Sequence, residues 1–151
     1  MAFGYHRRMN DASEPAATSP AFYKHWVEEQ VRYADLDPVG HCNSAVYSTF
    51  FESARVGLLE DCGLPQIGRS EAFAIVQQNI NYRRELKLGA RLRIGSRVVK
   101  LGRTSVTLAN AVFEGDVCAA TAEIIGVVIS MSARKSVELP ADLRERLAAY
   151  A

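Results

Sequence analysis

The chain has 151 residues, a length that suits one domain with a substantial hydrophobic core and is too short for two. Hydrophobic residues make up 48% and charged residues 23% of the sequence, and 18 basic against 17 acidic side chains give a formal net charge of +1. This balance argues against a nucleic-acid partner, because such a protein usually has a basic excess or a basic cluster, and here Lys and Arg are scattered.

The cysteines and the N-terminal residues indicate an intracellular protein. Cys42, Cys62 and Cys118 are widely spaced and form no C-x-x-C pair, so we expect neither a disulfide framework nor a zinc site, and a reducing cytoplasm. We expect no membrane association, because no secretory signal and no run of roughly 18 apolar residues is present. Residues 1–20 are rich in Ala, Ser and Pro and predict a flexible leader, followed by one domain over 21–151.

The domain begins with a strand and a long helix joined by a polar loop. Residues 26–33 are β-branched and aromatic with partial alternation, which predicts a strand. The loop over 34–42 leads to Asn43, a good N-cap residue, so we expect a helix to begin at Ser44. Apolar residues then recur at helical spacing at Val46, Tyr47, Phe50, Phe51, Ala54, Leu58 and Leu59.

Stop and turn signals divide the rest of the chain. Gly63 suits the left-handed residue after a helix, and Pro65 cannot continue one. A short terminal helix is predicted after Pro140. Between them, short turns separate four predicted antiparallel strands over 72–82, 90–101, 104–114 and 117–131. The pattern is α+β, with one helix that must be covered by one sheet.

The segment from Val31 to Arg55, VRYADLDPVGHCNSAVYSTFFESAR, resembles the signature of the 4-hydroxybenzoyl-CoA thioesterase family of hot-dog proteins. The segments Ile80–Gly89 and Leu101–Ser105 are similar to further patterns of that family, so the resemblance spans most of 26–135. It implies a five-stranded antiparallel sheet wrapped around one long central helix. It also implies a homodimer or homotetramer in which side-by-side dimers share a sheet and the active sites lie at the dimer interface.

Thioester hydrolysis needs a carboxylate that activates water or attacks the carbonyl, and donors that stabilise the oxyanion. By the resemblance, Asp37 in the D-P-x-G piece is that carboxylate, as general base or nucleophile. The alternative reading of the residues alone is a local Asp-Pro turn. Asp35 is the other candidate acid, although we expect it to be structural. The backbone N–H of Ser44, at the expected helix start, is the predicted oxyanion donor.

Other residues of this segment have candidate roles in catalysis or in the substrate pocket. Asn43 is expected to cap the helix and so to orient its N–H groups, and Gly40 lets the backbone approach the ligand. His41 either hydrogen-bonds the thioester carbonyl or water, or is a structural hydrogen-bonder. Tyr47 lies on the apolar stripe, as a core or a pocket residue. A sister branch of the fold uses a helix Glu, but we expect Glu52 to pair with the arginine three residues on.

Polar and basic residues outside the loop complete the predicted site. Gln77 and Asn79, polar among apolar neighbours, are candidates for the substrate pocket across the interface. Coenzyme A carries a 3′-phosphate and a pyrophosphate, and the resemblance assigns these to Lys100 and Arg103; a solvated turn is the alternative. Further basic candidates are Arg83 and Arg84.

We therefore predict an acyl-CoA thioesterase that releases a carboxylic acid and free CoA, with acyl-CoA as substrate and no metal or bound cofactor. A non-catalytic acyl-CoA-binding hot-dog protein is one alternative, since this kind of fold is reused for binding. Asp37 argues against it, because binding alone does not need that acid. A hot-dog hydratase or dehydratase is the other alternative, but its His-containing catalytic loop is not found. The sequence does not reveal the acyl group.

Overall fold

The computed structural model describes residues 16–64 and 70–151. The expected order of one strand, one long helix and four further strands is confirmed. The strands are β1 (His25–Gln30), β2 (Glu71–Tyr82), β3 (Arg91–Leu101), β4 (Ser105–Glu114), β5 (Val117–Ser130) and β6 (Lys135–Ser136). The helices are α1 (Val46–Asp61) and α2 (Ala141–Ala148), with short 3-10 helices η1 (Pro20–Phe22) and η2 (Tyr33–Asp35). Neither α-helix in these ranges is long and apolar enough to cross a membrane.

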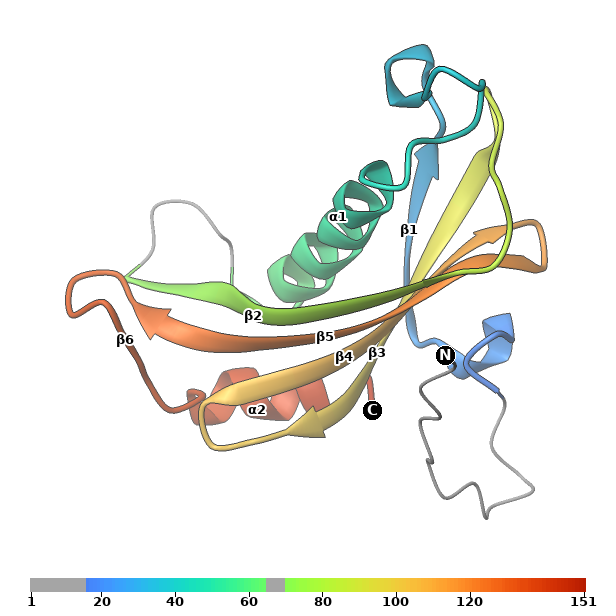
Figure 1. Cartoon of the computed structure of the whole chain (residues 1–151). Helices are drawn as coiled ribbons and strands as arrows, with labels where there is room; N and C mark the ends of the chain where they lie inside the picture. The colour runs from blue at the N-terminus through green and yellow to red at the C-terminus, as the bar shows by residue number, and fades with distance from the viewer. Residues whose placement is uncertain (1–15, 65–69) are drawn as a thin grey trace, which may run out of the picture.

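One antiparallel sheet with the order β1-β3-β4-β5-β2 curls around α1 (Figure 1). The short links between β3, β4 and β5 make these strands neighbours, whereas β1 and β2, which flank α1 in the sequence, form the two edges. The two-residue strand β6 pairs only with the end of β5. The predicted hot-dog fold, a five-stranded sheet wrapped around one long helix, is confirmed, with β6 as a small addition.

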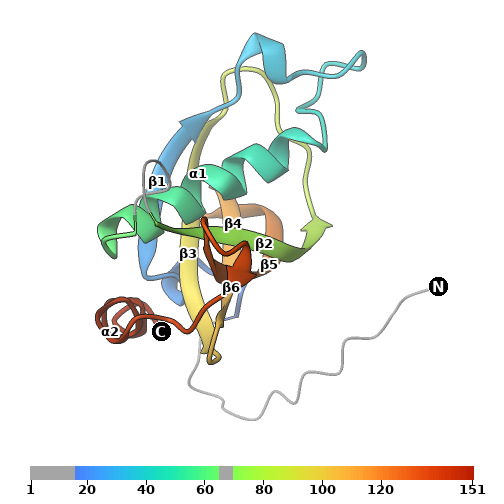
Figure 2. The same cartoon turned by 90° about the vertical axis from the view of Figure 1, so that its left-hand side faces the viewer.

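The inner face of the curled sheet holds α1, which crosses the strands (Figure 2). Phe51, Ala54, Leu58 and Leu59 have no exposed surface and pack in one cluster with apolar residues of the sheet. Burying one large apolar side chain contributes roughly 1.5 to 3 kcal/mol. The apolar stripe predicted from the sequence is therefore the centre of the core.

The start of α1 differs from the prediction. We expected the helix to begin at Ser44, but Ser44 lies in a turn and α1 begins at Val46. The reason is a tight local turn around Asn43. Its side-chain Oδ1 accepts the N–H of Ala45 at 3.0 Å, and its carbonyl accepts the N–H of Val46 at 2.9 Å. The first helical turn therefore forms only after this turn is complete.

The predicted end of α1 is confirmed, because Gly63 adopts φ +78° directly after the helix. Pro65, the other stop signal, lies outside the described residues. The predicted terminal helix is confirmed as α2, which packs beside this end of α1. The Arg146 guanidinium donates to the carbonyl of Cys62 at 3.3 Å, and Leu147 is fully buried in the core.

Most of the predicted leader, residues 1–15, lies outside the described residues. The residues that follow pack onto the domain, because the Tyr23 hydroxyl donates to the Ala17 carbonyl at 2.7 Å. Tyr23, Phe22 and Phe113 form a second apolar cluster, separate from the core around α1. The chain thus enters β1 from a fixed position.

Replacing Phe51 with alanine tests the central place of α1. The side chain is fully buried, so its removal leaves a cavity, and we expect the free energy of unfolding to fall by about 3 to 5 kcal/mol. Urea unfolding measures this change. Glu60→Ala, at an exposed position of the same helix, should change it by no more than about 0.5 kcal/mol. Equal losses in both variants would contradict the packing described.

Candidate active site

The loop between η2 and α1 is closed at its base by backbone hydrogen bonds. The N–H of Asn43 donates to the carbonyl of Asp35 at 2.8 Å, and Leu36 and Cys42 form an isolated β-bridge. The N–H of Cys42 donates to the carbonyl of Leu86 at 2.8 Å, which ties the loop to the segment after β2. The residues between these hydrogen-bonded positions therefore form a short loop with fixed ends.

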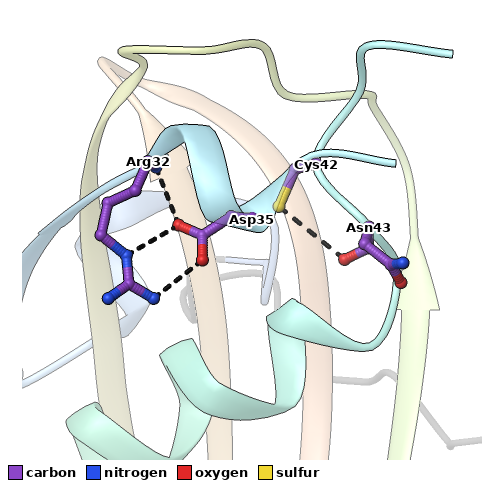
Figure 3. A network of polar contacts seen from close by, with 4 residues as sticks. All are labelled: Arg32, Asp35, Cys42 and Asn43. Carbon is purple, nitrogen blue, oxygen red and sulfur yellow. Dashed lines mark hydrogen bonds and ion pairs between the residues drawn. The ribbon is translucent and has the colours of Figure 1, made fainter. Parts of the chain in front are cut away.

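The Asp35 carboxylate anchors this base (Figure 3). Its Oδ1 accepts from Arg32 Nη2 at 2.8 Å, and its Oδ2 accepts from Arg32 Nε at 3.0 Å and from the Arg32 backbone N–H at 2.8 Å. These hydrogen bonds, with the positive charge of Arg32, hold the pKa of Asp35 below its usual range. Asp35 is buried and its two oxygens are both occupied. Its role in the chain is therefore structural.

Asp37 combines a turn role with an open carboxylate oxygen. Its Oδ1 accepts the N–H groups of Val39 at 2.9 Å and His41 at 3.1 Å. Gly40, at φ +82°, completes the turn by donating its N–H to the Asp37 carbonyl at 3.0 Å. No donor from the described ranges hydrogen-bonds Asp37 Oδ2. One carboxylate oxygen of Asp37 therefore stabilises the local turn, and the other is open.

A cavity of about 530 Å³ lies beside this loop, at the N-terminal end of α1. It brings together seven of the candidate residues predicted from the sequence, namely Asp37, His41, Asn43, Ser44, Tyr47, Arg83 and Arg84. The rest of its lining is Cys42, Tyr82 and Glu85. The predicted residues outside this lining are Gly40, Gln77, Asn79, Lys100 and Arg103.

Ser44 provides an unpaired backbone donor in this cavity. The N–H groups of the two residues after it are bonded to Asn43, which forms the turn before α1, while the N-cap position itself is Ala45 and not Asn43 as predicted. Over residues 16–64 and 70–151, no protein acceptor receives the Ser44 N–H. An unpaired N–H at the positive end of a helix dipole is suited to stabilise a developing negative charge.

Two cavity residues, Tyr82 and Glu85, are not among the residues predicted from the sequence. Glu85 Oε2 lies 3.1 Å from His41 Nε2, so the imidazole of His41 is held on one side. The Tyr82 hydroxyl donates to the Ser44 carbonyl at 3.0 Å. Both residues belong to the segment 80–89, whose resemblance to the family was the available signal. Nothing in their spacing connects them to a loop some forty residues earlier.

Gln77 and Asn79 lie on β2, with their side chains exposed. Gln78 between them is oriented toward α1 and donates to Ser48 Oγ at 2.9 Å. Because successive side chains of a strand alternate between faces, its two neighbours are directed away from the helix. In the single chain these residues therefore do not meet the cavity that holds Asp37.

The basic candidates divide into two groups. Lys100 and Arg103 lie at the turn between β3 and β4, which Figure 1 shows at the opposite end of the sheet from the loop before α1. Arg103 pairs with Glu138 at 2.9 Å. Arg83 and Arg84 line the cavity instead, and Arg83 forms no ion pair within the described part of the chain.

Two further groups near α1 are unsuited to the chemistry. Burial, together with the charges of Asp35 and Asp37, raises the pKa of the Cys42 thiol to about 11, so it is protonated at neutral pH and not a nucleophile. Glu52 lies 3.5 Å from Arg55, as the predicted ion pair, and does not line the cavity. No cluster of three His, Cys, Asp or Glu side chains that could hold a metal occurs in the described segments.

A sheet curled around one long helix, with a cavity at the start of that helix, is the architecture of a hot-dog protein. The model of the thioesterase-like superfamily matches residues 31–147, and the chain belongs to this family. The sequence-based predictions of family and enzyme class are confirmed at this level.

Curated and structural relatives agree with this assignment. The chain is 37% identical over 123 residues to the long-chain acyl-CoA thioesterase FadM of Escherichia coli K12, which covers 78% of this chain and 92% of FadM. The structure resembles the PA5185 protein of Pseudomonas aeruginosa, with a TM-score of 0.80, 29% identity and coverage of 85% and 92%. It also resembles a thioesterase of Thermus thermophilus complexed with coenzyme A and Zn, with a TM-score of 0.74, 28% identity and coverage of 85% and 94%.

Asp35→Asn tests the anchor of the loop. The folded-state pKa of Asp35 is lowered, so its ionised form stabilises the fold above its ordinary pKa of about 3.9, and this stabilisation is lost as the pH falls through the lowered value. We expect the variant to lose about 1 to 3 kcal/mol of unfolding free energy at neutral pH. The deficit should shrink below about pH 4, as measured by denaturant unfolding. A deficit independent of pH would contradict the ionic anchor.

Proposed function

We propose that this protein is an acyl-CoA thioesterase that hydrolyses its substrate to a carboxylic acid and free CoA. The observation that carries the proposal is that Asp37 and Ser44 line one cavity, and that Asp37 Oδ2 and the Ser44 N–H have no hydrogen-bond partner among the described residues. Two relatives support the substrate class: FadM, a long-chain acyl-CoA thioesterase, and the Thermus thermophilus thioesterase with coenzyme A bound.

Asp37 has two chemical routes in this proposal. As a general base it takes a proton from water, whose oxygen attacks the thioester carbonyl. As a nucleophile it attacks the carbonyl itself and forms a mixed anhydride that water then hydrolyses. In both routes the C–S bond breaks, and the CoA thiolate leaves and takes up a proton. The carbonyl oxygen becomes negative on the way, and the Ser44 N–H stabilises it, by roughly 2.7 to 4 kcal/mol for donors of this kind.

The neighbouring residues hold this arrangement in place. The second ring nitrogen of His41 has no hydrogen-bond partner within the described chain, and in this proposal it bonds the attacking water or the carbonyl. The Asn43 side chain accepts the N–H of Ala45 at 3.0 Å, so in this proposal it stabilises the turn that presents Ser44. Gly40 allows the tight turn that brings the Asp37 carboxylate to the cavity.

The phosphates of CoA need a basic partner, and Arg83 and Arg84 are the guanidinium groups that line the cavity. We propose that these two arginines bind the phosphates, since planar guanidinium groups match phosphate geometry. Lys100 and Arg103, at the other end of the sheet, contribute only if a partner subunit brings them to this cavity. The same holds for Gln77 and Asn79 as pocket residues.

The acyl group and the location of the reaction follow from separate observations. The cavity within one chain is lined mostly by polar residues, so the apolar acyl group must extend beyond it. We propose a long acyl chain, on the basis of the 37% identity to FadM. We propose a cytoplasmic location because Cys42, Cys62 and Cys118 are all free thiols.

We propose that two copies of the chain pair through β2 and share a continuous sheet. This strand runs from Glu71 to Tyr82 at the edge of the sheet and pairs only with β5. Its Ile75 and Val76 side chains are 41% and 60% exposed. A long, exposed, apolar edge strand is a template for pairing with another chain. Such a dimer places residues of one subunit near the cavity of the other.

Asp37→Asn tests the proposed carboxylate. The amide oxygen of asparagine can still accept the N–H groups of Val39 and His41, so the turn should persist, while the base or nucleophile is lost. We expect turnover to fall by about 100-fold or more, with little change in unfolding free energy. The measurement is release of free thiol from short, long and aromatic acyl-CoA substrates.

Asp116→Asn is the matched control, because Asp116 is an exposed acid in the turn between β4 and β5 and does not line the cavity. Its turnover should equal that of the wild type. Full turnover of Asp37→Asn on a good substrate would remove Asp37 from the mechanism. Acyl-CoA binding without any thiol release by the wild type would favour the non-catalytic binding protein instead.

Val76→Lys tests the paired edge. A charge in the centre of an apolar edge strand opposes pairing, so we expect a monomer where the wild type is a dimer or tetramer. Light scattering coupled to size exclusion measures the mass. Val117→Lys introduces the same charge at a residue that is 47% exposed on β5 and should leave the mass unchanged. A Val76→Lys variant with the wild-type mass would contradict pairing through this edge.

A further inference from the structure

Two tyrosines connect the start of α1 with the end of β2 in a reciprocal manner. The Tyr47 hydroxyl, from α1, donates to the carbonyl of Arg84 at 3.2 Å. The Tyr82 hydroxyl, from β2, donates to the carbonyl of Ser44 at 3.0 Å. Their rings meet edge to face, with centroids 5.2 Å apart and planes at 89°. Each tyrosine therefore fixes a backbone carbonyl on the segment that carries the other.

The bond from Tyr82 concerns the residue that presents the unpaired N–H. In a regular helix beginning at Ser44, its carbonyl would accept the N–H of Ser48. In this structure Ser48 donates to the carbonyl of Ala45 at 3.2 Å, and α1 begins at Val46. The Ser44 carbonyl thus lies outside the helical ladder, and the Tyr82 hydroxyl is the partner it has instead.

The position of the Ser44 N–H depends on the turn at Asn43 together with this contact. Asn43 is held on its N-terminal side by the bond to the Asp35 carbonyl at 2.8 Å. Ser44 itself has an exposed side chain and no side-chain hydrogen bond within the described chain. The Asn43 carbonyl, in the same peptide plane as the Ser44 N–H, accepts the N–H of Val46 at 2.9 Å, and the bond from Tyr82 to the Ser44 carbonyl holds the next peptide plane. Tyr82 is only half-exposed at 53%, and its ring packs on the buried ring of Tyr47.

We propose that Tyr82 is a positioning residue for hydrolysis, which holds the peptide group after Ser44 and so, together with the turn at Asn43, keeps the Ser44 N–H directed at the thioester oxyanion. This inference rests on the proposed thioesterase function. Tyr82 does not need to touch the substrate in this role. Its hydroxyl matters for the transition state, where the oxyanion forms, and not for binding of the CoA moiety.

Tyr82→Phe removes only the hydroxyl and keeps the ring contact with Tyr47. We expect kcat for acyl-CoA hydrolysis to fall about 10- to 100-fold, because a misplaced donor no longer matches the oxyanion. KM should stay within about twofold, as expected when an interaction made only in the transition state is lost. The inhibition constant of an S-alkyl-CoA thioether, which lacks the carbonyl, should also stay unchanged.

Tyr23→Phe is the matched control. Its hydroxyl also donates to a backbone carbonyl, that of Ala17 at 2.7 Å, but it belongs to the second apolar cluster and does not line the cavity. We expect this variant to keep the wild-type kcat even where its unfolding free energy falls. The control therefore separates the fall in kcat predicted for Tyr82→Phe from a general loss of stability.

The outcomes separate this inference from the function on which it rests. If Asp37→Asn loses turnover but Tyr82→Phe retains the wild-type kcat, the positioning role is wrong and the thioesterase assignment stands. A rise in KM and in the thioether inhibition constant at unchanged kcat would make Tyr82 a binding residue and would equally overturn the inference. Absence of thiol release from the wild type would instead overturn the proposed function.

Discussion

The hydrogen bond from the Asn43 N–H to the Asp35 carbonyl, 2.8 Å long, closes the loop between β1 and α1, and the site depends on it. Closure places the Asp37 turn beside the first turn of α1. The Asp35 carboxylate reinforces the same point through three hydrogen bonds from Arg32. The charged carboxylate of Asp35 thus holds the backbone at the base of the loop. Asp37, the next acid along the chain, keeps one carboxylate oxygen open.

The same helix serves the core and the site. Its apolar stripe is covered by the curled sheet, which fixes its axis, and its first turn then lies at the cavity. Tyr47 and Cys42 belong to both, since they are buried in the core cluster and also line the cavity. Movement of the helix N-terminus would therefore disturb packing, which makes the site rigid. A preorganised donor of this kind needs little reorganisation during the reaction.

The sequence predicts the elements well because their signals are local. The apolar period of α1, the stop at Gly63 and the turns between β3, β4 and β5 each depend on neighbouring residues, and the structure confirms them. The link after β2 does not join neighbouring strands as predicted, because β2 pairs with β5. The start of α1 was misplaced by two residues, because a tight turn around Asn43 precedes the helix and leaves the carbonyl of Ser44 to bond to Tyr82, distant in the sequence. Propensity at Asn43 and Ser44 does not contain that contact.

The outer parts of the site depend on tertiary geometry that the sequence does not encode locally. Alternation along β2 defines two faces but not which face meets α1, and the register shift between Ile75 and Gln77 changes the phase within the strand. Family resemblance indicated Asp37 and the expected helix start indicated Ser44, and the structure shows that both line one cavity. The family resemblance assigned no role to Tyr82 or Glu85, because their contacts become visible only in the folded chain.

The most direct test of the account is a crystal structure with an acyl-CoA analogue in which CH₂ replaces the thioester sulfur. We expect the analogue carbonyl oxygen to lie about 2.7 to 3.1 Å from the Ser44 nitrogen. We also expect the open oxygen of Asp37 to lie next to the carbonyl carbon, directly or through one water. A carbonyl bound away from these two groups would contradict it.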